Sequence, residues 1–563
     1  MQLSEQEQVR REKLTKLRAL GINPYPADLF PVDAMTSDIK HNFENGKKVI
    51  IAGRLMSRRI QGKASFAELQ DSKGRIQVYF NRDEICPGED KVLYNEVYKK
   101  LLDIGDFIGV EGELFTTKVG EKTVMVKSFK LLSKALKPLP LPKTDSEGNT
   151  FDEFNNPELR YRQRYADLVV NPKVKEVFIK RTKLFTAMRT FFNNSGYFEV
   201  ETPILQSIPG GAAARPFKTH HNSLDIPMFM RIACELYLKK LIVGGFDGVY
   251  EFAKTFRNEG MDRTHNPEFT MMEIYVAYKD YNWMMDLTEK LLEFCATEVN
   301  GSSKSIFGEH EINFKAPYAR VTMAESIEHH TGFDILGKSE NEIREAAKGM
   351  GIEVDETMGK GKIIDEIFGE KCEANYIQPT FITDYPKEMS PLTKEHRSNP
   401  DLTERFELII CGKELANAYS ELNDPIDQRA RFEDQVKLAG RGDDEATEFI
   451  DQDFLRALEY GMPPTSGMGI GMDRLIMFLT NNASIQEVLF FPQMKPEVKQ
   501  VDMSDDEKAI INILKVNSPI ELNELKTQSG LSNKKWDKTI KELTKKNIAK
   551  VNKTENGLFV EVV

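Results

Sequence analysis

The chain has 563 residues, of which 40% are hydrophobic and 29% charged. This balance is typical of a folded multidomain protein and excludes a collagen-like or membrane-spanning chain, since no apolar run approaches the ~18 residues that a spanning helix needs. The net charge of −11 excludes a uniformly basic nucleic-acid coat. The five cysteines form no CxxC pair and the N-terminus is highly charged without an apolar signal core, so we expect no structural zinc, no disulfides and a cytoplasmic location.

The first 150 residues predict a helix followed by a small β-barrel. Residues 3–20 have helical spacing of apolar side chains, within a lead-in of residues 1–48. From 49 to 136, short β runs surround one helical stretch at 89–102, which favours an OB-fold; the alternative is a β domain without a nucleic-acid role. The proline-rich sequence KPLPLP then opens a linker over residues 137–150.

The rest of the chain divides into a large block and a small C-terminal unit. The block, residues 151–500, contains a long helix at 174–194 and a charged, helical insertion at about 335–370. Residues 503–563 predict three short helices and a hairpin turning at Asn556-Gly557, the order of a winged helix-turn-helix. The fold class is therefore α+β multidomain.

Four segments of the large block stand out. They are ETP at 201–203, RNE with HNPEFTMMEIY at 257–275, ELANAYSELNDP at 414–425 and GMGIGMDRL at 467–475. Together they resemble motifs 1, 2 and 3 of class II aminoacyl-tRNA synthetases, in the family's order. The second and third segments resemble lysyl-tRNA synthetases in particular. The resemblance spans about residues 1–500, so the C-terminal unit is an addition to the family pattern.

The resemblance implies an ATP-dependent ligase that joins lysine to AMP with release of pyrophosphate and then transfers it to the 3′ end of tRNA(Lys). Negative charge accumulates on phosphate oxygens in such a reaction, so the site needs planar cations and metal-binding carboxylates. Arg257 is suited to bridge the lysine carboxylate and the α-phosphate, and Arg474 to hold the far phosphate. These two arginines are the predicted catalytic residues.

The rest of the ATP site is also implied by the resemblance. Phe269 would stack on adenine, and Glu259 would accept a hydrogen bond from its amino group. The full ATP-binding set is Arg257, Asn258, Glu259, His265, Asn266, Phe269, Glu414, Leu415, Gly471, Met472, Asp473 and Arg474. We expect about two to three Mg²⁺ ions alongside ATP.

Glu407 and Glu414 are the predicted metal ligands. A hairpin turning at Gly412-Lys413 would pair Cys411 with Glu414 and place both glutamates on one face of the strands; the alternative is a pair of exposed strand glutamates. That regular register would turn Asn417 and Glu421 to the opposite face. The family places them in the pocket, so we expect a bulge or bend.

A lysine substrate requires an acidic pocket. Glu421, Tyr275 and Glu273 are suited to surround its ε-ammonium. By resemblance, Glu235 takes the α-ammonium, although the Lys-Lys pair that follows is also typical of a surface helix. The predicted lysine-binding residues are Gly211, Glu235, Glu273, Tyr275, Asn417 and Glu421.

Two regions are candidates for binding tRNA. Residues 47–137 carry 18 Lys and Arg against 12 Asp and Glu, and within them Phe66 and Gln77 match positions that contact the anticodon in related synthetases. Arg58 is a further anticodon candidate from the same face; a core aromatic and a solvated charge are the alternatives. In the tail, residues 533–553 hold eight lysines and two acids, which fits nucleic-acid contact, a partner protein or a solvated face.

Other functions remain open. Aspartyl and asparaginyl synthetases share this layout but need groups that recognise an acid or an amide. A transferase that adds lysine to a protein factor would lack the barrel, and an inactive RNA-binding protein would not need the intact motif residues. The family dimerises through motif 1, so we expect a homodimer built partly from residues 174–203.

Overall fold

In the computed structural model, the chain forms two compact units, Met1–Gln493 and Met494–Val563. The structure describes residues 3–144, 150–151, 154–212, 214–440, 450–496, 503–546, 548–554 and 557–562. Asn556, expected in the C-terminal turn, lies outside these residues. No helix among the described residues is long and apolar enough to span a bilayer.

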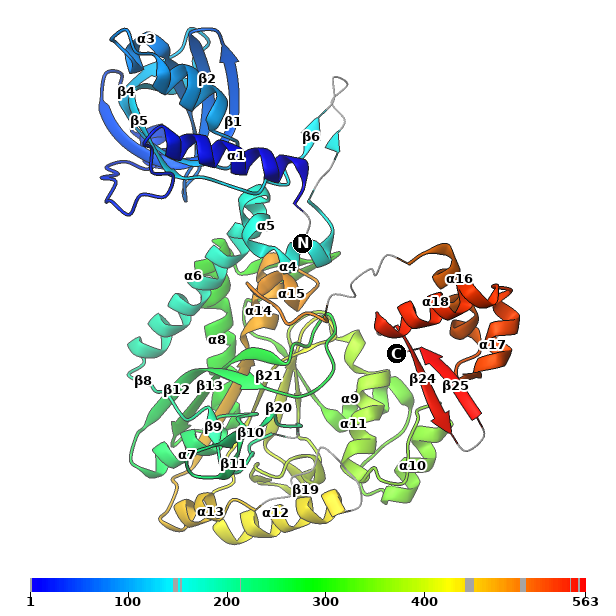
Figure 1. Cartoon of the computed structure of the whole chain (residues 1–563). Helices are drawn as coiled ribbons and strands as arrows, with labels where there is room; N and C mark the ends of the chain where they lie inside the picture. Colours follow the sequence, from blue (N-terminus) through cyan, green and yellow to red (C-terminus); the bar gives the residue numbers. More distant parts are fainter. Residues whose placement is uncertain are drawn as a thin grey trace. The chain divides into compact units, whose positions relative to one another are not determined.

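The N-terminal part is a closed five-stranded barrel preceded by two helices (Figure 1). Helix α1 (Glu5–Ala19) starts at a capping box in which Ser4 and Glu7 exchange hydrogen bonds, and α2 (Thr36–His41) follows. The strand order is β1-β2-β3-β5-β4, with α3 (Arg82–Ile85) and the π-helix η1 (Leu93–Leu101) between β3 and β4. The strands are β1 (Lys48–Gln61), β2 (Ala64–Gln70), β3 (Arg75–Asn81), β4 (Phe107–Thr116) and β5 (Lys122–Ser133). This is the OB-fold order.

Strand β1 contains a bulge. Leu55 pairs with Leu69 and Ser57 with Glu68, which leaves Met56 as an extra residue. An extra residue reverses the side-chain alternation of the strand beyond it. The two ends of β1 therefore follow opposite parities.

The centre of the large block is an eight-stranded sheet. Its order is β16-β17-β20-β21-β22-β13-β12-β8, and all pairs are antiparallel except β16 with β17 and β12 with β8. In that order the strands are Ala319–Thr322, Thr380–Thr383, Arg405–Ile409, Glu414–Ser420, Thr465–Gly471, Glu268–Ala277, Gly248–Phe256 and Phe198–Glu199. The mostly antiparallel sheet with flanking helices matches the expected class II architecture.

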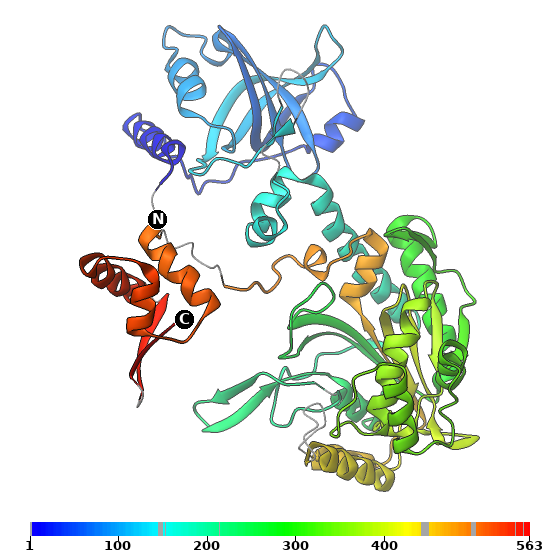
Figure 2. The same ribbon diagram turned by 90° about the vertical axis from the view of Figure 1, so that its right-hand side faces the viewer.

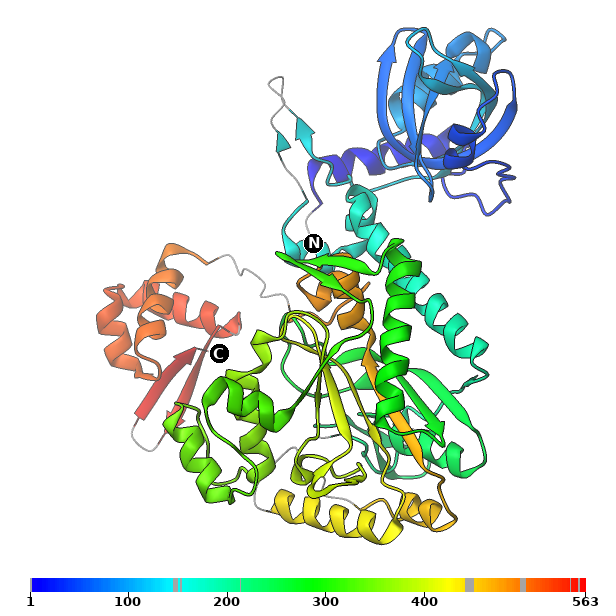
Figure 3. The same ribbon diagram turned by 180° about the vertical axis from the view of Figure 1, so that it is seen from behind.

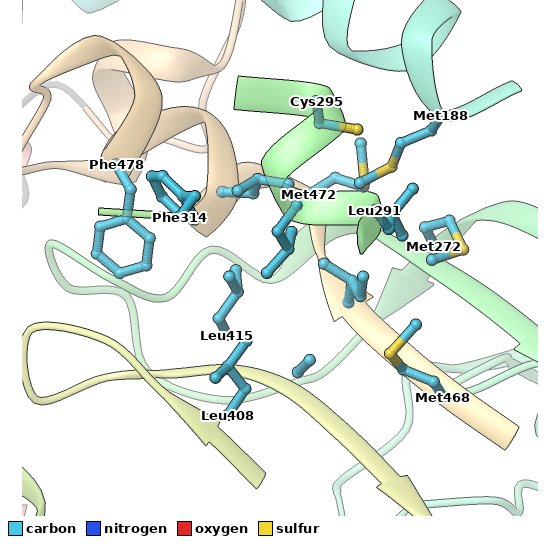
Figure 4. Close-up of a cluster of buried hydrophobic side chains, with 14 of the residues drawn as sticks. Met188, Met272, Leu291, Cys295, Phe314, Leu408, Leu415, Met468, Met472 and Phe478 are labelled. Carbon is cyan, nitrogen blue, oxygen red and sulfur yellow. The ribbon is translucent and has the colours of Figure 1, made fainter. Parts of the chain in front are cut away.

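Three helices cover one face of this sheet. Helix α6 (Pro172–Asn194) and α8 (Tyr281–Asn300) lie side by side (Figures 1 and 3), and α14 (Met472–Thr480) packs with them. Apolar side chains from alternate strand positions meet the helices, as Figure 4 shows for Met272 beside Leu291 of α8, and Leu408 and Met468 belong to the same cluster. The remaining side chains, at the intervening positions of each strand, point to the other face of the sheet.

The expected insertion lies between β16 and β17. Its residues, about 335–370, contain α10 (Glu340–Gly349) and α11 (Lys360–Lys371), and α9 (Met323–Thr331) precedes them. Their apolar faces form a core of their own with Ile382 and Ile409 of the sheet. The insertion is therefore a packed part of the large block.

The C-terminal unit contains the three helices and the hairpin expected from the sequence (Figure 2). Helices α16 (Asp505–Val516), α17 (Leu522–Ser529) and α18 (Asn533–Lys545) pack around Trp536 and Leu543. The hairpin of β24 (Ala549–Thr554) and β25 (Gly557–Val562) is extended by the short strand β23 (Ile520–Glu521).

Candidate active site

A cavity of about 860 Å³ lies on the sheet face that the three helices leave open. Strands β13, β21 and β22 each contribute alternate residues to it, including Glu273, Asn417 and Gly469. Their neighbours along the strands, such as Met272, belong to the core on the other face. The cavity is thus the second face of the central sheet.

The β20–β21 hairpin differs from the expected register. The turn is at Cys411-Gly412, one residue earlier than expected, and both residues have positive φ, 49° and 63°. Glu414 consequently pairs with Ile409, and the expected pairing of Cys411 with Glu414 is wrong. The two positive φ values match a two-residue type I′ turn, in which glycine is favoured.

A bulge follows this turn, as the resemblance required. Ile409 pairs with Glu414 and Leu408 with Ala416, so Leu415 is the extra residue. Beyond it Asn417 pairs directly with Glu407, and residues 417, 419 and 421 share the parity that faces the cavity. Without the bulge these residues would point into the core.

Three buried carboxylates gather at one end of the cavity. Glu421 is 2% exposed, and Glu235 and Glu273 are each 5% exposed. Burial and the nearby Glu235 raise the pKa of Glu273 to about 7, and Tyr275 donates a hydrogen bond to Glu273 at 3.2 Å. Burial likewise raises the pKa of Glu421. A cluster of this kind is stabilised by a cationic ligand.

Glu421 lies just beneath the cavity lining and has one unused oxygen. Its Oε1 is buried without a hydrogen-bond partner among the described residues. A Cβ added to Gly467 would overlap both this oxygen and the ring of Tyr275. Position 467 therefore admits only glycine while the carboxylate keeps this position.

Lys239 is a pocket residue that the sequence reasoning missed. It lies on α7 (Glu235–Val243), four residues after Glu235, and is fully buried. Its Nζ forms ion pairs with Glu235 at 2.6 Å and with Glu421. The i, i+4 spacing places Lys239 on the same helix face as Glu235. A Lys-Lys pair is typical of a surface helix, but the burial of Glu235 and Lys239 shows that this face of α7 is not at the surface.

Arg257 and Phe269 lie together at the loop between β12 and β13. The Arg257 guanidinium is 5.2 Å from the centre of the Phe269 ring. Its Nε is buried without a partner in the described part of the chain. Both residues line the cavity, so a cation and an aromatic face are available to a nucleotide.

The other predicted ATP residues do not all reach the cavity. Its lining includes the predicted residues Glu259, His265, Asn266, Glu414, Leu415, Gly471, Asp473 and Arg474. Asn258 is not among the lining residues. The Met472 side chain is fully buried in the helix-covered core, because position 472 begins α14. The prediction that Met472 belongs to the ATP site therefore concerns its backbone, since its side chain does not line the cavity.

Asp473 and Arg474 have different surroundings. The Asp473 carboxylate is occupied by Arg181 at 2.6 Å and by the backbone N–H of Thr270 at 2.8 Å, so it fastens α14 to α6 and β13. Arg474 donates a hydrogen bond to the backbone carbonyl of Glu414, and its guanidinium is 3.7 Å from the Glu414 carboxylate. Arg474 thus lines the cavity as a cation next to Glu414.

Glu407 and Glu414 both line the cavity. Burial and the charge of Glu414 raise the pKa of Glu407 to about 8, although Arg405 pairs with Glu407 at 2.5 Å. No cluster of three or more metal-binding side chains occurs in the described residues. Two carboxylates fit Mg²⁺, whose remaining ligands are phosphate oxygens and water.

The barrel presents a second candidate site on its outer face. Phe66 and Tyr79 lie opposite each other on β2 and β3, with ring centres 4.9 Å apart. Gln77 shares this face and donates a hydrogen bond to Thr123 at 2.8 Å. Phe66 is half-buried, so it is not a core aromatic.

Arg58 does not share the face of Phe66, and that expectation is wrong. Because of the bulge at Met56, Arg58 lies opposite Ala67, which points into the barrel. Its guanidinium donates to the backbone carbonyl of Tyr98. Arg59 lies opposite Phe66, with its guanidinium 5.8 Å from the ring centre, and takes the place expected of Arg58.

Comparison with known proteins covers both parts of the larger unit. Residues 156–495 match the family described as tRNA synthetases class II (D, K and N), and residues 49–132 match the OB-fold nucleic acid binding domain. Residues beyond 495 lie outside both matches.

Three curated relatives have the same name, lysine–tRNA ligase. The protein of Christiangramia forsetii is 76% identical over 561 residues, which cover 100% of this chain and 98% of the relative. That of Porphyromonas gingivalis is 68% identical over 502 residues, 88% of this chain and 86% of the relative. That of Azobacteroides pseudotrichonymphae is 63% identical over 498 residues, 88% of this chain and 99% of the relative.

Proposed function

The chain belongs to the lysine–tRNA ligases, a family of class II aminoacyl-tRNA synthetases, and from this membership we propose how its residues divide the reaction. Lysine and ATP form lysyl-adenylate and pyrophosphate, and the lysyl group then passes to the 3′ end of tRNA(Lys). Both steps take place in the cavity of the central sheet, and the barrel binds the anticodon.

Two arginines act on the reacting groups. Arg257 contacts the lysine carboxylate and the α-phosphate, and its unpaired Nε supports this role. Arg474 stabilises the leaving pyrophosphate. Phe269 stacks on adenine, and Glu259 accepts from the adenine amino group. Their contribution is mainly positioning and charge stabilisation at the phosphates.

Magnesium belongs to the same proposal. Glu407 and Glu414, which both line the cavity, would hold it. When bound, Mg²⁺ supplies charge neutralisation at the phosphate oxygens. Arg405 keeps Glu407 in place on the sheet face.

The acidic pocket determines the selectivity for lysine. Its three buried carboxylates and the unpartnered Oε1 of Glu421 favour a ligand with two ammonium groups. Gly211 and Asn417 both line the cavity and are available as polar contacts for the substrate backbone. An aspartate side chain would add a further negative charge to this acidic pocket, which disfavours the aspartyl alternative.

ATP–pyrophosphate exchange with all twenty amino acids, with Mg²⁺ and without tRNA, tests this proposal. We expect exchange with lysine alone. Exchange with aspartate or asparagine would overturn the specificity, and no exchange with any amino acid would overturn the activity. Omitting Mg²⁺ is expected to abolish the lysine signal.

We also propose a homodimer formed through α6 and the segment that follows it. Ile179, Phe198, Ile204 and Leu205 are large apolar side chains that are exposed by 42–58%, and β8, which contains Phe198, is an edge strand of the sheet. Unpaired edges and apolar patches are typical of protein interfaces. Sedimentation of wild type and of Phe198→Asp tests this, with a dimer expected for the first and dissociation for the second. A wild-type protein that sediments as a monomer would refute the proposal.

The C-terminal unit is proposed to add an RNA contact. Lys534, Lys538, Lys541 and Lys545 are exposed and follow one side of α18, opposite its buried Trp536. Two other lysines of the run instead pair with acids of α16, Lys535 with Asp506 and Lys546 with Glu507. A row of four lysines along a helix fits a phosphate backbone.

Truncation after residue 502 tests this contact, and the full chain with the four lysines changed to alanine isolates the row. We expect tRNA affinity to fall about tenfold and the salt dependence of binding to become shallower. Changing Lys508, Lys515 and Lys526 of the same unit is the matched control. Unchanged charging kinetics and salt slope in both variants would remove the proposal.

The cytoplasmic location also stays a proposal, supported by five cysteines that are all free.

A further inference from the structure

Lys239 has an environment that its role in the fold does not explain. Its side chain is fully buried, with its Nζ 5.5 Å from the centre of the Tyr419 ring and 5.8 Å from that of Phe454. Burial disfavours the charged ammonium, but Glu235 and Glu421 outweigh this and raise the pKa of Lys239. The ammonium group of Lys239 thus lies beside the carboxylates that are proposed to bind the ammonium groups of the substrate.

The contacts of Lys239 use one oxygen of each carboxylate. On Glu235, Oε1 receives both Lys239 at 2.6 Å and the hydroxyl of Tyr419 at 2.6 Å. The other oxygen, Oε2, is the one beside Gly211. On Glu421, Oε2 pairs with Lys239 while Oε1, beside Gly467, has no partner in the described residues.

This division leaves two acceptor oxygens for a ligand, one near Gly211 and one near Tyr275. It also fixes the charge of the pocket. Glu235, Glu273 and Glu421 carry up to three negative charges, and Lys239 cancels one of them. The remaining two match the two ammonium groups of lysine, whereas an uncompensated buried charge is strongly destabilising.

We propose that Lys239 is a specificity-determining positioning residue, which orients Glu235 and Glu421 and adjusts the pocket to two substrate ammonium groups. The inference rests on the proposed function, since it assumes that lysine binds there. Lys239 itself does not touch the reacting atoms. It acts through Glu235 and Glu421, by binding the carboxylate oxygen of each that the ligand does not use.

Lys239→Met in the full chain tests the inference by lysine-dependent ATP–pyrophosphate exchange. Methionine keeps the apolar stem and removes the charge. We expect the KM for lysine to rise ~100-fold with kcat and the KM for ATP changed less than about threefold. The acidic limb of kcat/KM for lysine should move to higher pH, because Glu273 and Glu421, whose pKa values burial already raises, then ionise without an internal cation. Tyr275 and Tyr419, which also face this group, remain neutral over that range.

Lys240→Met is the matched control, because Lys240 is the next residue on α7 but pairs with Asp453 at 2.8 Å and with Asp451 at 3.9 Å rather than with Glu235 or Glu421. It should leave the lysine KM and the pH profile unchanged. An unaltered lysine KM in Lys239→Met would overturn the inference, as would an equal rise in both substrate KM values. If the Met variant does not fold, Lys239→Arg keeps the cation and should keep the acidic limb in place; a shifted limb would contradict us. Absent lysine exchange in wild type would instead refute the proposed function.

Discussion

Two bulges, one in the barrel and one in the central sheet, decide which side chains reach each candidate site. In β1 the extra residue is Met56, and in β21 it is Leu415. Each reverses the alternation of the strand beyond it. The first turns Arg58 away from the face of Phe66, and the second brings Asn417 to the face of Glu407.

The difference between the two lies in what could reveal them. At β21, the motif resemblance required both Glu407 and Asn417 in one pocket, and regular alternation contradicted this, so a bulge was expected. At β1, no second requirement bears on the strand, and the sequence alone does not show that Arg59 rather than Arg58 lies opposite Phe66. The face on which a strand residue lies can thus be predicted from alternation only where a shared function is known for residues on both sides of any bulge.

The largest effect should come from Glu421, which reaches the lysine pocket only because of the Leu415 bulge. We expect Glu421→Gln to lower kcat/KM for lysine ~10³-fold while leaving ATP binding within about twofold, because the unpartnered Oε1 loses its charge. Lysine- and ATP-dependent exchange kinetics measure this. Glu404→Gln is the control, a buried glutamate that pairs with Arg397 away from the pocket. Near-normal lysine kinetics in Glu421→Gln would show that residue 421 does not serve the pocket.

A substitution at Gly467, on the neighbouring strand β22, tests the same geometry. A methyl group there would overlap Glu421 and Tyr275, so Gly467→Ala should lower lysine-dependent exchange by about 10–100-fold, as overpacking of a buried site does. Gly369→Ala in α11 is the control, since a Cβ at that position meets nothing within 4 Å. Equal activity of the two variants would contradict the placement of Glu421.

On the barrel, Phe66 should have an effect of intermediate size. Loss of base stacking in Phe66→Ala is expected to raise the KM for tRNA(Lys) about 10-fold, with lysine exchange in the absence of tRNA unchanged. Phe107→Ala changes another exposed aromatic of the barrel, on β4, and should leave the tRNA KM as it is. A parallel loss of exchange in Phe66→Ala would mean that the variant damages the fold.

Much of the molecule could be predicted, because strong periodicity and turn residues specify elements. The expected helix at 174–194 is α6, helices α10 and α11 lie in the segment predicted to be helical, and the C-terminal helices occur where the sequence predicts them. The hairpin turn was displaced by one residue, because Cys411 adopts a positive φ that only glycine favours. Lys239 was missed for a different reason: its burial depends on Glu421, which lies 182 residues away and joins it only in the folded chain.

The smallest effect discriminates between Arg59 and Arg58, and so tests the bulge at Met56 itself. Arg59 is exposed beside Phe66, so Arg59→Ala should raise the KM for tRNA about threefold and reduce the salt slope of binding by about one. Arg58 donates to the backbone of Tyr98 and lies 5.5 Å from the centre of its ring, so Arg58→Ala should cost about 1 kcal/mol of stability and leave the salt slope unchanged. Thermal unfolding and tRNA titrations at several salt concentrations measure both. The reverse result, with tRNA binding sensitive to Arg58 and not to Arg59, would mean that β1 alternates without interruption and that only the bulge of β21 is real.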